Sequence, residues 1–289
     1  MFRDITLGQY YPANSAVHRL DPRTKILLTI FYIVGVFFIK TYFSYAVTIL
    51  FLTSVILISK IPVLSVLKSI RGILFLVLFA SVLNLFFVSS GEVLFESWIT
   101  PRWVFRITMD GVHYSIKLTL RLILLVTGAS LLTFTTTPVE LTDGMESLMS
   151  PLKLIKVPVH DIAVIMSIAL RFIPTLLDET NKIMNAQKAR GASFDTGGIV
   201  KRAKALLPIL IPLFVSSFRR ADELAFAMNA RCYNATDKRT KMKELKFSLK
   251  DLIALILVLA FLTVVFLDRY YFMGIDSLLF PGVLRCAIL

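Results

Sequence analysis

The sequence predicts an all-α, polytopic membrane protein with about five transmembrane helices and a set of long cytoplasmic helices. Hydrophobic residues make up 56% of the 289 positions, and the mean hydropathy is +0.76, well above that of an ordinary soluble domain. Several apolar runs are long enough to cross the hydrocarbon core of a bilayer. Charged residues still account for 18% of the chain, so part of it must lie in water.

The first expected span opens on a capped helix. Asp21 can accept hydrogen bonds from the unpaired N–H groups of a helix start, and Pro22 suits the first helical position. The apolar run 26–39 follows, and with this capped turn it reaches the thickness of a bilayer core. The further expected spans cover residues 42–58, 72–89, 112–134 and 252–267.

Residues 90–110 are polar and aromatic, with Trp98 and Trp103 placed as side chains of a membrane–water interface would be. The span that follows carries Lys117 and Arg121 one helical turn apart, near the same end. Two interpretations of these cations stay open. Their side chains either reach back to the interface, or they contact a partner or a buried acid.

The character of the chain changes at residue 135. Thr137-Pro138-Val139-Glu140 is typical of a helix start, and two shorter apolar stretches, 162–177 and 205–215, are interrupted by prolines. We expect both stretches to lie at the membrane surface or against the spans, with additional spans as the alternative. The expected division is an N-terminal membrane region at 1–135, a cytoplasmic or interfacial region at 136–250, and a last span with its tail at 251–289.

Positive charge indicates which side of the membrane each segment faces. The formal net charge is +13, and most of the 32 Lys and Arg residues lie before the first span, around 60–71 and in 135–250. By the positive-inside rule these segments face the cytoplasm and the C-terminus faces out, as in a multi-pass protein of the cell membrane. We expect no nucleic-acid partner, because that would need a soluble basic surface.

Two helix-like segments end in the same short pattern. One ends in Ala189-Arg190-Gly191 and the other in Ala230-Arg231-Cys232, with the arginine between two small residues each time. Gly191 stands where a glycine commonly ends a helix. Apolar residues recur at helical spacing and give each segment an apolar face. On the second segment they are Phe214, Phe218, Ala221, Ala225 and Met228, and on the first the looser stripe includes Met184.

The two arginines have a structural and a functional interpretation. A cation at a helix C-terminus is stabilised by about 0.3–1 kcal/mol through the helix dipole. That effect predicts lysine as readily as arginine, and it does not account for the small neighbours. An arginine between small residues can enter a narrow groove and offer planar donors to carboxylates. Two such ends therefore suggest docking into two similar pockets.

Patterns for catalysis and metal binding are missing from the sequence. There is no GxxxxGK[ST] phosphate loop, no GxSxG and no HExxH, and the two cysteines and three histidines show no ligand spacing. We therefore expect no enzyme activity, no metal and no cofactor on this chain. No acidic residue falls inside an expected span, which argues against a transporter driven by protons or sodium ions.

Several motifs together resemble the transmembrane T component of energy-coupling factor (ECF) transporters, over nearly the whole chain. They are Ser15–Lys25, Thr137–Glu146, Ser167–Thr175, Ala189-Arg190-Gly191 and Ala230-Arg231-Cys232. The last two are similar to the paired Ala-Arg-X signatures of that family, and Cys232 stands where the family often has glycine.

This resemblance implies a coupling and scaffold subunit of an ABC importer for vitamins or similar micronutrients. Long cytoplasmic coupling helices would carry Arg190 and Arg231 into grooves of two ATP-binding subunits. A separate membrane-embedded S component would bind the substrate and contact the apolar faces of these helices. ATP hydrolysis would take place on the partner subunits and would reorient the S component in the lipid bilayer.

Two alternatives belong to other classes of protein. A self-contained secondary transporter or channel needs a polar path through its own spans, for which Lys117, Arg121 and Asn84 are the main candidates. A membrane enzyme acting on lipid phosphates needs a nucleophile or metal ligands near Arg190 or Arg231, and none stands out.

Overall fold

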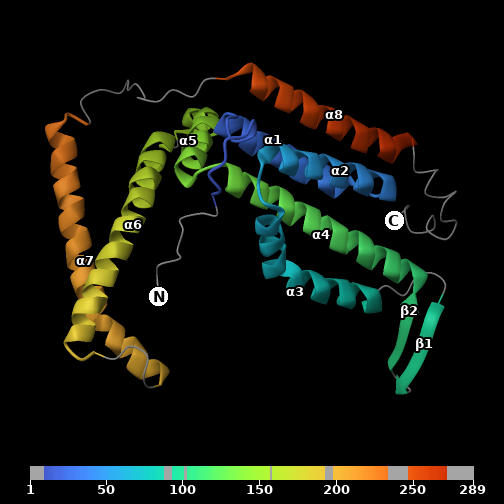
Figure 1. The fold of residues 1–289 in the computed structure, drawn as a ribbon, viewed down its shortest axis with the longest axis horizontal. Helices are drawn as coiled ribbons and strands as arrows, with labels where there is room; N and C mark the ends of the chain where they lie inside the picture. Colours follow the sequence, from blue (N-terminus) through green and yellow to red (C-terminus); the bar gives the residue numbers. More distant parts are fainter. Residues whose placement is uncertain are drawn as a thin grey trace. The chain divides into compact units, whose positions relative to one another are not determined.

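The computed structural model of the chain describes residues 10–87, 93–100, 103–156, 158–192, 198–233 and 247–271. It is built of helices, with one short hairpin of strands (Figure 1). The helices are α1 (Pro22–Phe38), α2 (Tyr42–Ser59), α3 (Val63–Phe87), α4 (Met109–Thr135), α5 (Pro138–Leu148), the 3-10 helix η1 (Ser150–Ile155), α6 (Val159–Ala189), α7 (Ile199–Ala230) and α8 (Leu249–Tyr271), and the strands are β1 (Val93–Thr100) and β2 (Trp103–Thr108). The prediction of a helical, polytopic architecture is confirmed, and the hairpin is an addition to it.

These elements form two compact units. The multi-helix unit holds α1 to α5, the hairpin and α8. The paired-helix unit holds η1, α6 and α7. Helix α5 belongs to the first unit because it packs on α1.

Five helices of the described chain are long and apolar enough to cross a membrane: α2, residues 63–85 of α3, α4, α6 and α8. The expected number of spans is confirmed, but one member of the set differs. Helix α1 has 17 residues and is not among the five. Helix α6 is among them, although we expected its apolar stretch at the membrane surface. Its 31 residues run on through Pro174, which gives it the length that the interrupted stretch lacks.

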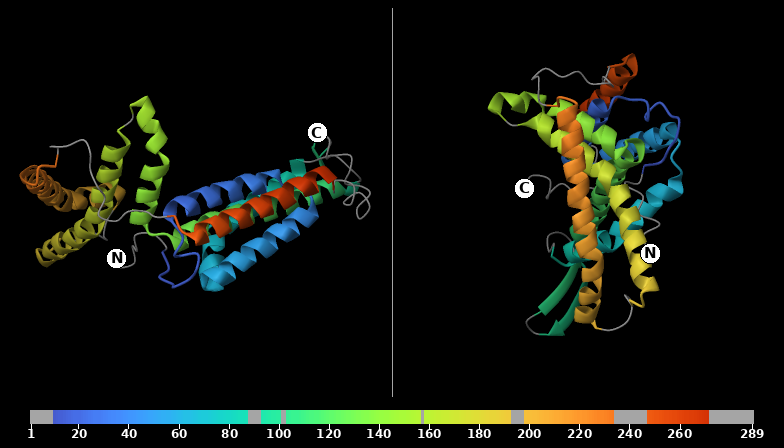
Figure 2. Two further views of the ribbon diagram at one scale, coloured as in Figure 1. Left: turned by 90° about the horizontal axis from the view of Figure 1, so that it is seen from above. Right: turned by 90° about the vertical axis from the view of Figure 1, so that its left-hand side faces the viewer.

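Helix α1 packs against α4, α5 and α8 in the multi-helix unit, and α8 runs alongside it (Figure 2). The close approach of α1 and α4 depends on Gly128 of α4, since a Cβ there would lie 2.2 Å from Cε1 of Tyr32 in α1. At Gly35 of α1 a Cβ would lie 2.7 Å from Cδ2 of Leu262. The buried apolar cluster consists of Tyr32, Val36, Ile39, Tyr45, Leu52, Leu124, Phe261 and Val265.

The start of α1 is tied to the start of α8. The Asp21 carboxylate accepts from the Arg23 N–H at 2.9 Å, so the predicted cap is confirmed. The buried Asp251 carboxylate accepts from the Asp21 N–H at 2.8 Å and from the Thr24 hydroxyl at 2.9 Å. It also accepts from the Ser248 N–H at 2.7 Å, which caps α8 itself. One carboxylate thus forms hydrogen bonds at the starts of two helices that lie far apart in the sequence.

The segment before α1 is held by Lys25 and His18. Buried Lys25 donates through Nζ to the carbonyls of His18 at 3.0 Å and Thr135 at 2.9 Å. His18 donates through Nε2 to the Tyr11 carbonyl at 3.0 Å, and its Nδ1 accepts from Ser15 Oγ at 2.7 Å. Burial lowers the pKa of His18, which suits this neutral tautomer.

The predicted start of α5 is confirmed as a reciprocal cap. The Glu140 N–H donates to Thr137 Oγ1 at 3.3 Å, and the Thr137 N–H donates to the Glu140 carboxylate at 3.4 Å. Gly144 then lets α5 approach α1, because a Cβ there would lie 3.0 Å from Cβ of Pro22.

The polar and aromatic segment 90–110 contains the antiparallel pair β1 and β2, in register Trp98 to Val104 and Glu96 to Arg106. No strand was predicted there. The run of Val93–Thr100 is rich in β-branched and aromatic residues, which favour a paired strand. The Thr108 hydroxyl then accepts from the Gly111 N–H at 3.2 Å and caps α4.

Lys117 and Arg121 lie close to the end of α1 and the start of α2. Arg121 donates from Nη2 to the carbonyl of Ile39, the C-cap of α1, at 2.9 Å. The ammonium group of Lys117 lies 4.7 Å from the centre of the Tyr42 ring. Both cations therefore contact the chain's own helices α1 and α2, and the carbonyl at the end of α1 is a favourable acceptor for a cation.

Helix α8 is longer than the expected span and includes the acids at both its ends. Asp251 and Asp268 are both buried. The Asp268 carboxylate accepts from the hydroxyls of Thr41 and Ser44 near the start of α2. Both acids lie outside the expected span 252–267, at the two ends of the longer helix, and hydroxyl and amide donors stabilise their carboxylates in the interior.

Candidate docking site

The paired-helix unit consists mainly of α6 and α7, which pack against each other (Figure 1). Helix α7 has 32 residues and continues through Pro208 and Pro212, as α6 continues through Pro174. The expectation of two interrupted stretches is corrected in this respect. A proline removes one hydrogen bond and bends a helix, but the packing of a long amphipathic helix can outweigh that loss.

Helix α6 ends in a Schellman motif with Arg190 as its C-cap. The next residue, Gly191, has a left-handed φ of 87°. The N–H of Gly191 donates to the carbonyl of Lys188 at 2.9 Å, and the N–H of Ala192 donates to the carbonyl of Gln187 at 3.0 Å. The predicted glycine cap is therefore confirmed, and its geometry directs the chain away from the helix at the arginine.

Helix α7 ends in the same motif with Arg231 as its C-cap. Cys232 takes the left-handed place of the glycine, with φ 55°. The N–H of Cys232 donates to the carbonyl of Asn229 at 3.0 Å, and the N–H of Tyr233 donates to the carbonyl of Met228 at 3.1 Å. A side chain in this conformation costs about 1–2 kcal/mol. The left-handed conformation of Cys232 was not predicted from the sequence.

The two arginines occupy equivalent positions. Arg190 has φ −85° and ψ 7°, and Arg231 has φ −94° and ψ 15°. Both are exposed, as are Ala189 before the first and Ala230 before the second. The capping geometry explains a small residue after each arginine, a part of the pattern that we had attributed to docking. It does not explain the two alanines or the choice of arginine.

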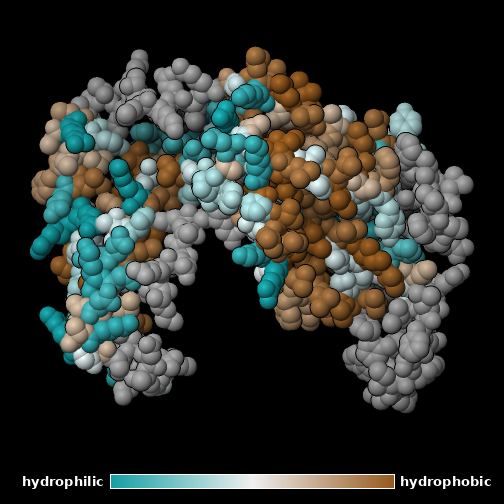
Figure 3. Space-filling model, viewed as in Figure 1, coloured by the Kyte–Doolittle hydropathy of each residue, from teal (hydrophilic) through white to brown (hydrophobic). Residues whose placement is uncertain are grey.

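The apolar face expected on α7 is largely uncovered. Phe214 is 61% exposed and Phe218 is 67% exposed, and their rings stack with centroids 6.4 Å apart. Ala221 and Ala225 extend the same face and are also exposed. Met228 of α7 and Met184 of α6 are partly buried. Hydrophobic and hydrophilic side chains both gather over this pair of helices (Figure 3).

Two features of this surface were missed. The apolar face begins earlier, because Leu207 and Leu210 are exposed and lie on the same side as Phe214 by helical spacing. Phe226 is 75% exposed on the neighbouring side of α7. Its neighbours at helical spacing include Asp222, so periodicity alone assigned that side to the polar surface. From 207 to 225 the face is about 27 Å long at 1.5 Å per residue.

Each of the two helices ends in a cation, and an apolar strip runs along α7. Helix α7 follows α6 in the chain, and Arg231 lies about 48 Å of helical rise from the start of α7. A planar guanidinium at each end can pair with carboxylates. Among the residues that the structure describes, no group of three or more His, Cys, Asp or Glu could hold a metal ion.

These features define a class: a multi-pass membrane protein whose two long paired helices each end in an exposed arginine. Residues 13–242 match the model of the family described as cobalt transport protein, CbiQ. The chain is 52% identical over 273 residues to the energy-coupling factor transporter transmembrane protein EcfT of Ruminiclostridium cellulolyticum, a match that covers 94% of this chain and 100% of the relative.

Two further relatives with the same name extend this result. The protein of Acidaminococcus fermentans is 51% identical, over 91% of this chain and 98% of its own length. The protein of Bacillus subtilis is 42% identical, with the same two coverages. The chain therefore belongs to the family of transmembrane T components of ECF transporters.

Proposed function

We propose that this chain is the coupling and scaffold subunit of an ECF-type ABC importer. It would link ATP hydrolysis by two ATP-binding subunits to the reorientation of a membrane-embedded S component that carries a vitamin or similar micronutrient. The chain itself would have no catalytic site. The observation that carries the proposal is the equivalence of the two exposed ends at Arg190 and Arg231 in a member of this family.

Each end would dock into one ATP-binding subunit through Ala189-Arg190-Gly191 and Ala230-Arg231-Cys232. Two equivalent surfaces suit a pair of similar partners, because each partner can then use the same kind of groove. The small neighbours leave room around the guanidinium, and a carboxylate in the groove would complete a bidentate pair. Docking at the end of a stiff helix would transmit a movement of the partner along that helix.

The strip of Phe214, Phe218, Ala221 and Ala225 would contact the S component, with Met228 and Met184 beside it. With the exposed Leu207 and Leu210, this strip makes an apolar face about 27 Å long, and a continuous exposed apolar surface marks an interaction site. Small and flexible side chains also let a partner helix pack closely and shift. We propose that the N-terminus and the region 136–250 lie on the cytoplasmic side, so that α6, although long and apolar enough to cross a membrane, lies along its surface. This placement is in line with the distribution of positive charge.

The test is co-purification of the full chain from membranes with its ATP-binding subunits, together with substrate uptake. The double variant Arg190→Ala/Arg231→Ala is expected to lose the ATP-binding subunits or the uptake that depends on them. The matched control is Arg219→Ala, an exposed arginine on the side of α7 away from the apolar strip. Full complex and full uptake in the double variant would contradict the docking role. A wild-type chain that purifies alone and moves a solute unaided would favour a self-contained transporter.

A further inference from the structure

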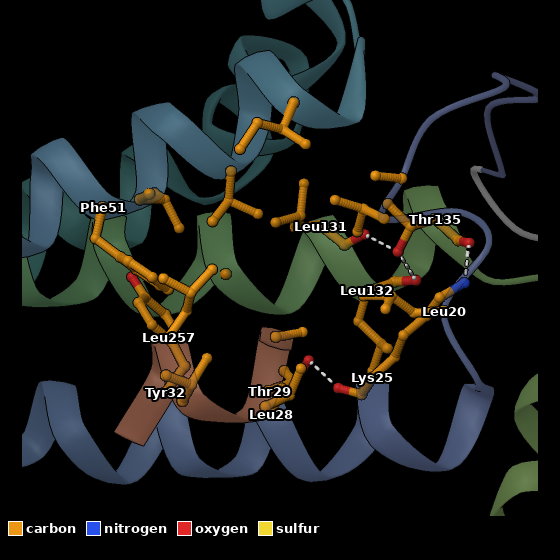
Figure 4. A pocket seen from close by; sticks show the side chains of 18 of the residues that line it. Leu20, Lys25, Leu28, Thr29, Tyr32, Phe51, Leu131, Leu132, Thr135 and Leu257 are labelled. Carbon is orange, nitrogen blue, oxygen red and sulfur yellow. Dashed lines mark hydrogen bonds between the residues drawn. The ribbon is translucent and has the colours of Figure 1, made fainter. Parts of the chain in front are cut away.

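The multi-helix unit contains a cavity of about 440 Å³ that the coupling role does not use. Residues of α1, α2, α4 and α8 line it, together with Ala16, Val17 and Leu20 before α1, and the cavity is partly open to the outside. Tyr32, Phe51 and Leu257 lie toward one end of it, and Leu20, Lys25 and Thr135 lie toward the other (Figure 4). The size is within the range of ligand-binding cavities.

Polar groups of the wall are already hydrogen-bonded inside the chain. Thr29 donates to the carbonyl of Lys25 at 2.8 Å, and Tyr32 donates to the carbonyl of Leu124 at 3.1 Å. The Thr135 hydroxyl donates to the carbonyl of Leu131 at 2.8 Å. The rest of the lining is mainly leucine, isoleucine, valine and phenylalanine. An apolar lining of this kind favours contact with hydrocarbon over contact with water.

One end of the cavity carries a cation at the surface. Lys250 lines the cavity and is exposed, and it lies at the α1 start because its neighbour Asp251 bonds there to Asp21. The carboxylate of Asp251 is occupied by three donors and turned into the protein. The ammonium of Lys25 is likewise bound to two carbonyls. Of the two cations that line the cavity, Lys250 is therefore the exposed one, and it can bind an anion at the surface.

We propose that this cavity holds one acyl chain of an anionic phospholipid, with the phosphate at Lys250. From Lys250 to Val258 the wall of α8 rises about 12 Å, enough to take a substantial part of an acyl chain. Basic side chains beside openings between membrane helices bind anionic head groups in this way. The apolar wall would bind the acyl chain of the lipid, and the cation of Lys250 would select a head group with negative charge.

The test is native mass spectrometry of the full chain in detergent, titrated with phosphatidylglycerol or with phosphatidylcholine of the same acyl chains. Phosphatidylglycerol is expected to bind about fivefold more tightly, the effect of one lysine near a membrane surface. Lys250→Gln should abolish this preference, and the control Lys40→Gln, another exposed lysine, should keep it. Ala254→Phe, which fills the cavity, should remove the bound lipid, whereas Ala260→Phe on the exposed side of α8 should not.

Equal binding of the two lipids by the wild-type chain would overturn the proposal. So would bound lipid that persists in a folded Ala254→Phe variant. If circular dichroism shows that Ala254→Phe does not fold, the comparison of Lys250→Gln with Lys40→Gln decides the matter. A preference retained in Lys250→Gln would then refute the site.

Discussion

Gly191 and Cys232 occupy the same left-handed position after two helices, with φ of 87° and 55°. Glycine adopts this conformation without steric cost, whereas a cysteine meets a clash between its Cβ and the backbone. The same motif therefore ends α6 with less strain than it ends α7. This difference affects the two proposed docking ends directly, because each arginine immediately precedes the left-handed residue.

The Gly191→Ala substitution should loosen the end of α6, by about 0.5–1 kcal/mol once the smaller freedom of alanine in the unfolded chain is included. Cys232→Gly should act in the opposite direction at the end of α7, by about 0.5–1 kcal/mol once the greater freedom of glycine in the unfolded chain is included. Hydrogen exchange of the amides in the last turn of each helix measures both effects. Exchange should speed up in the first variant and slow about two- to fivefold in the second.

Unchanged exchange in both variants would contradict the left-handed caps. A matched control is Gly72→Ala in α3, where a Cβ meets nothing within 4 Å and no cap is involved. It should leave the exchange of both helix ends as in the wild type.

At the scale of elements, the contact between α1 and α4 depends on the absence of a side chain at Gly128. A Cβ there would lie 2.2 Å from the Tyr32 ring, a buried residue of the central cluster. Gly128→Ala should therefore force the helices apart and lower the thermal stability of the purified chain, by about 1–3 kcal/mol for overpacking.

Gly72→Ala serves as the control for that variant as well. Alanine favours a helix over glycine by up to about 1 kcal/mol, and there is space for it at Gly72. Its melting temperature should stay the same or rise. A Gly128→Ala variant that melts no lower than the wild type would show that α1 and α4 are not packed as described.

Local patterns in the sequence predicted where helices start. They did not predict how long the helices are or which long-range hydrogen bonds join them. Asp21 with Pro22 and Thr137 with Glu140 were recognisable because a cap is made by residues close in sequence. The bonds from Asp251 to Asp21 and Thr24 join residues more than 200 positions apart, for which no local signal exists. Helix α6 was underestimated because Pro174 was taken as an interruption, although the helix packs along α7 and continues.

The candidate site was predictable to a similar degree. Helical spacing identified Phe214 and Phe218 and the repeated pattern identified Arg190 and Arg231, so these residues could be named from the sequence. The exposure of Phe226 depends on which side of α7 meets α6, and periodicity does not contain that information. The left-handed backbone conformation of Cys232 was not predicted either, because this conformation is usually inferred from a glycine, which this helix end lacks.

At the scale of the molecule, the chain combines a multi-helix unit with internal ties and a pair of long helices with uncovered surfaces. The first unit buries carboxylates and cations in bonds to its own helix ends. The second leaves Phe214, Phe218, Phe226, Arg190 and Arg231 exposed. This contrast is what a scaffold subunit needs, because a stable membrane part can hold helices whose free surfaces are completed by other proteins.

The central claim is that each arginine-bearing end meets an ATP-binding subunit, while the apolar strip meets a different membrane protein. The most direct measurement is photo-crosslinking in membranes from a benzophenone amino acid placed singly at Ala189, Ala230 or Ala221, with the exposed Ile30 of α1 as the control position. Probes at Ala189 and Ala230 should give adducts with ATP-binding subunits, and the probe at Ala221 should give an adduct with a small membrane protein. Adducts with ATP-binding subunits from Ile30 alone, or from neither helix end, would contradict the account.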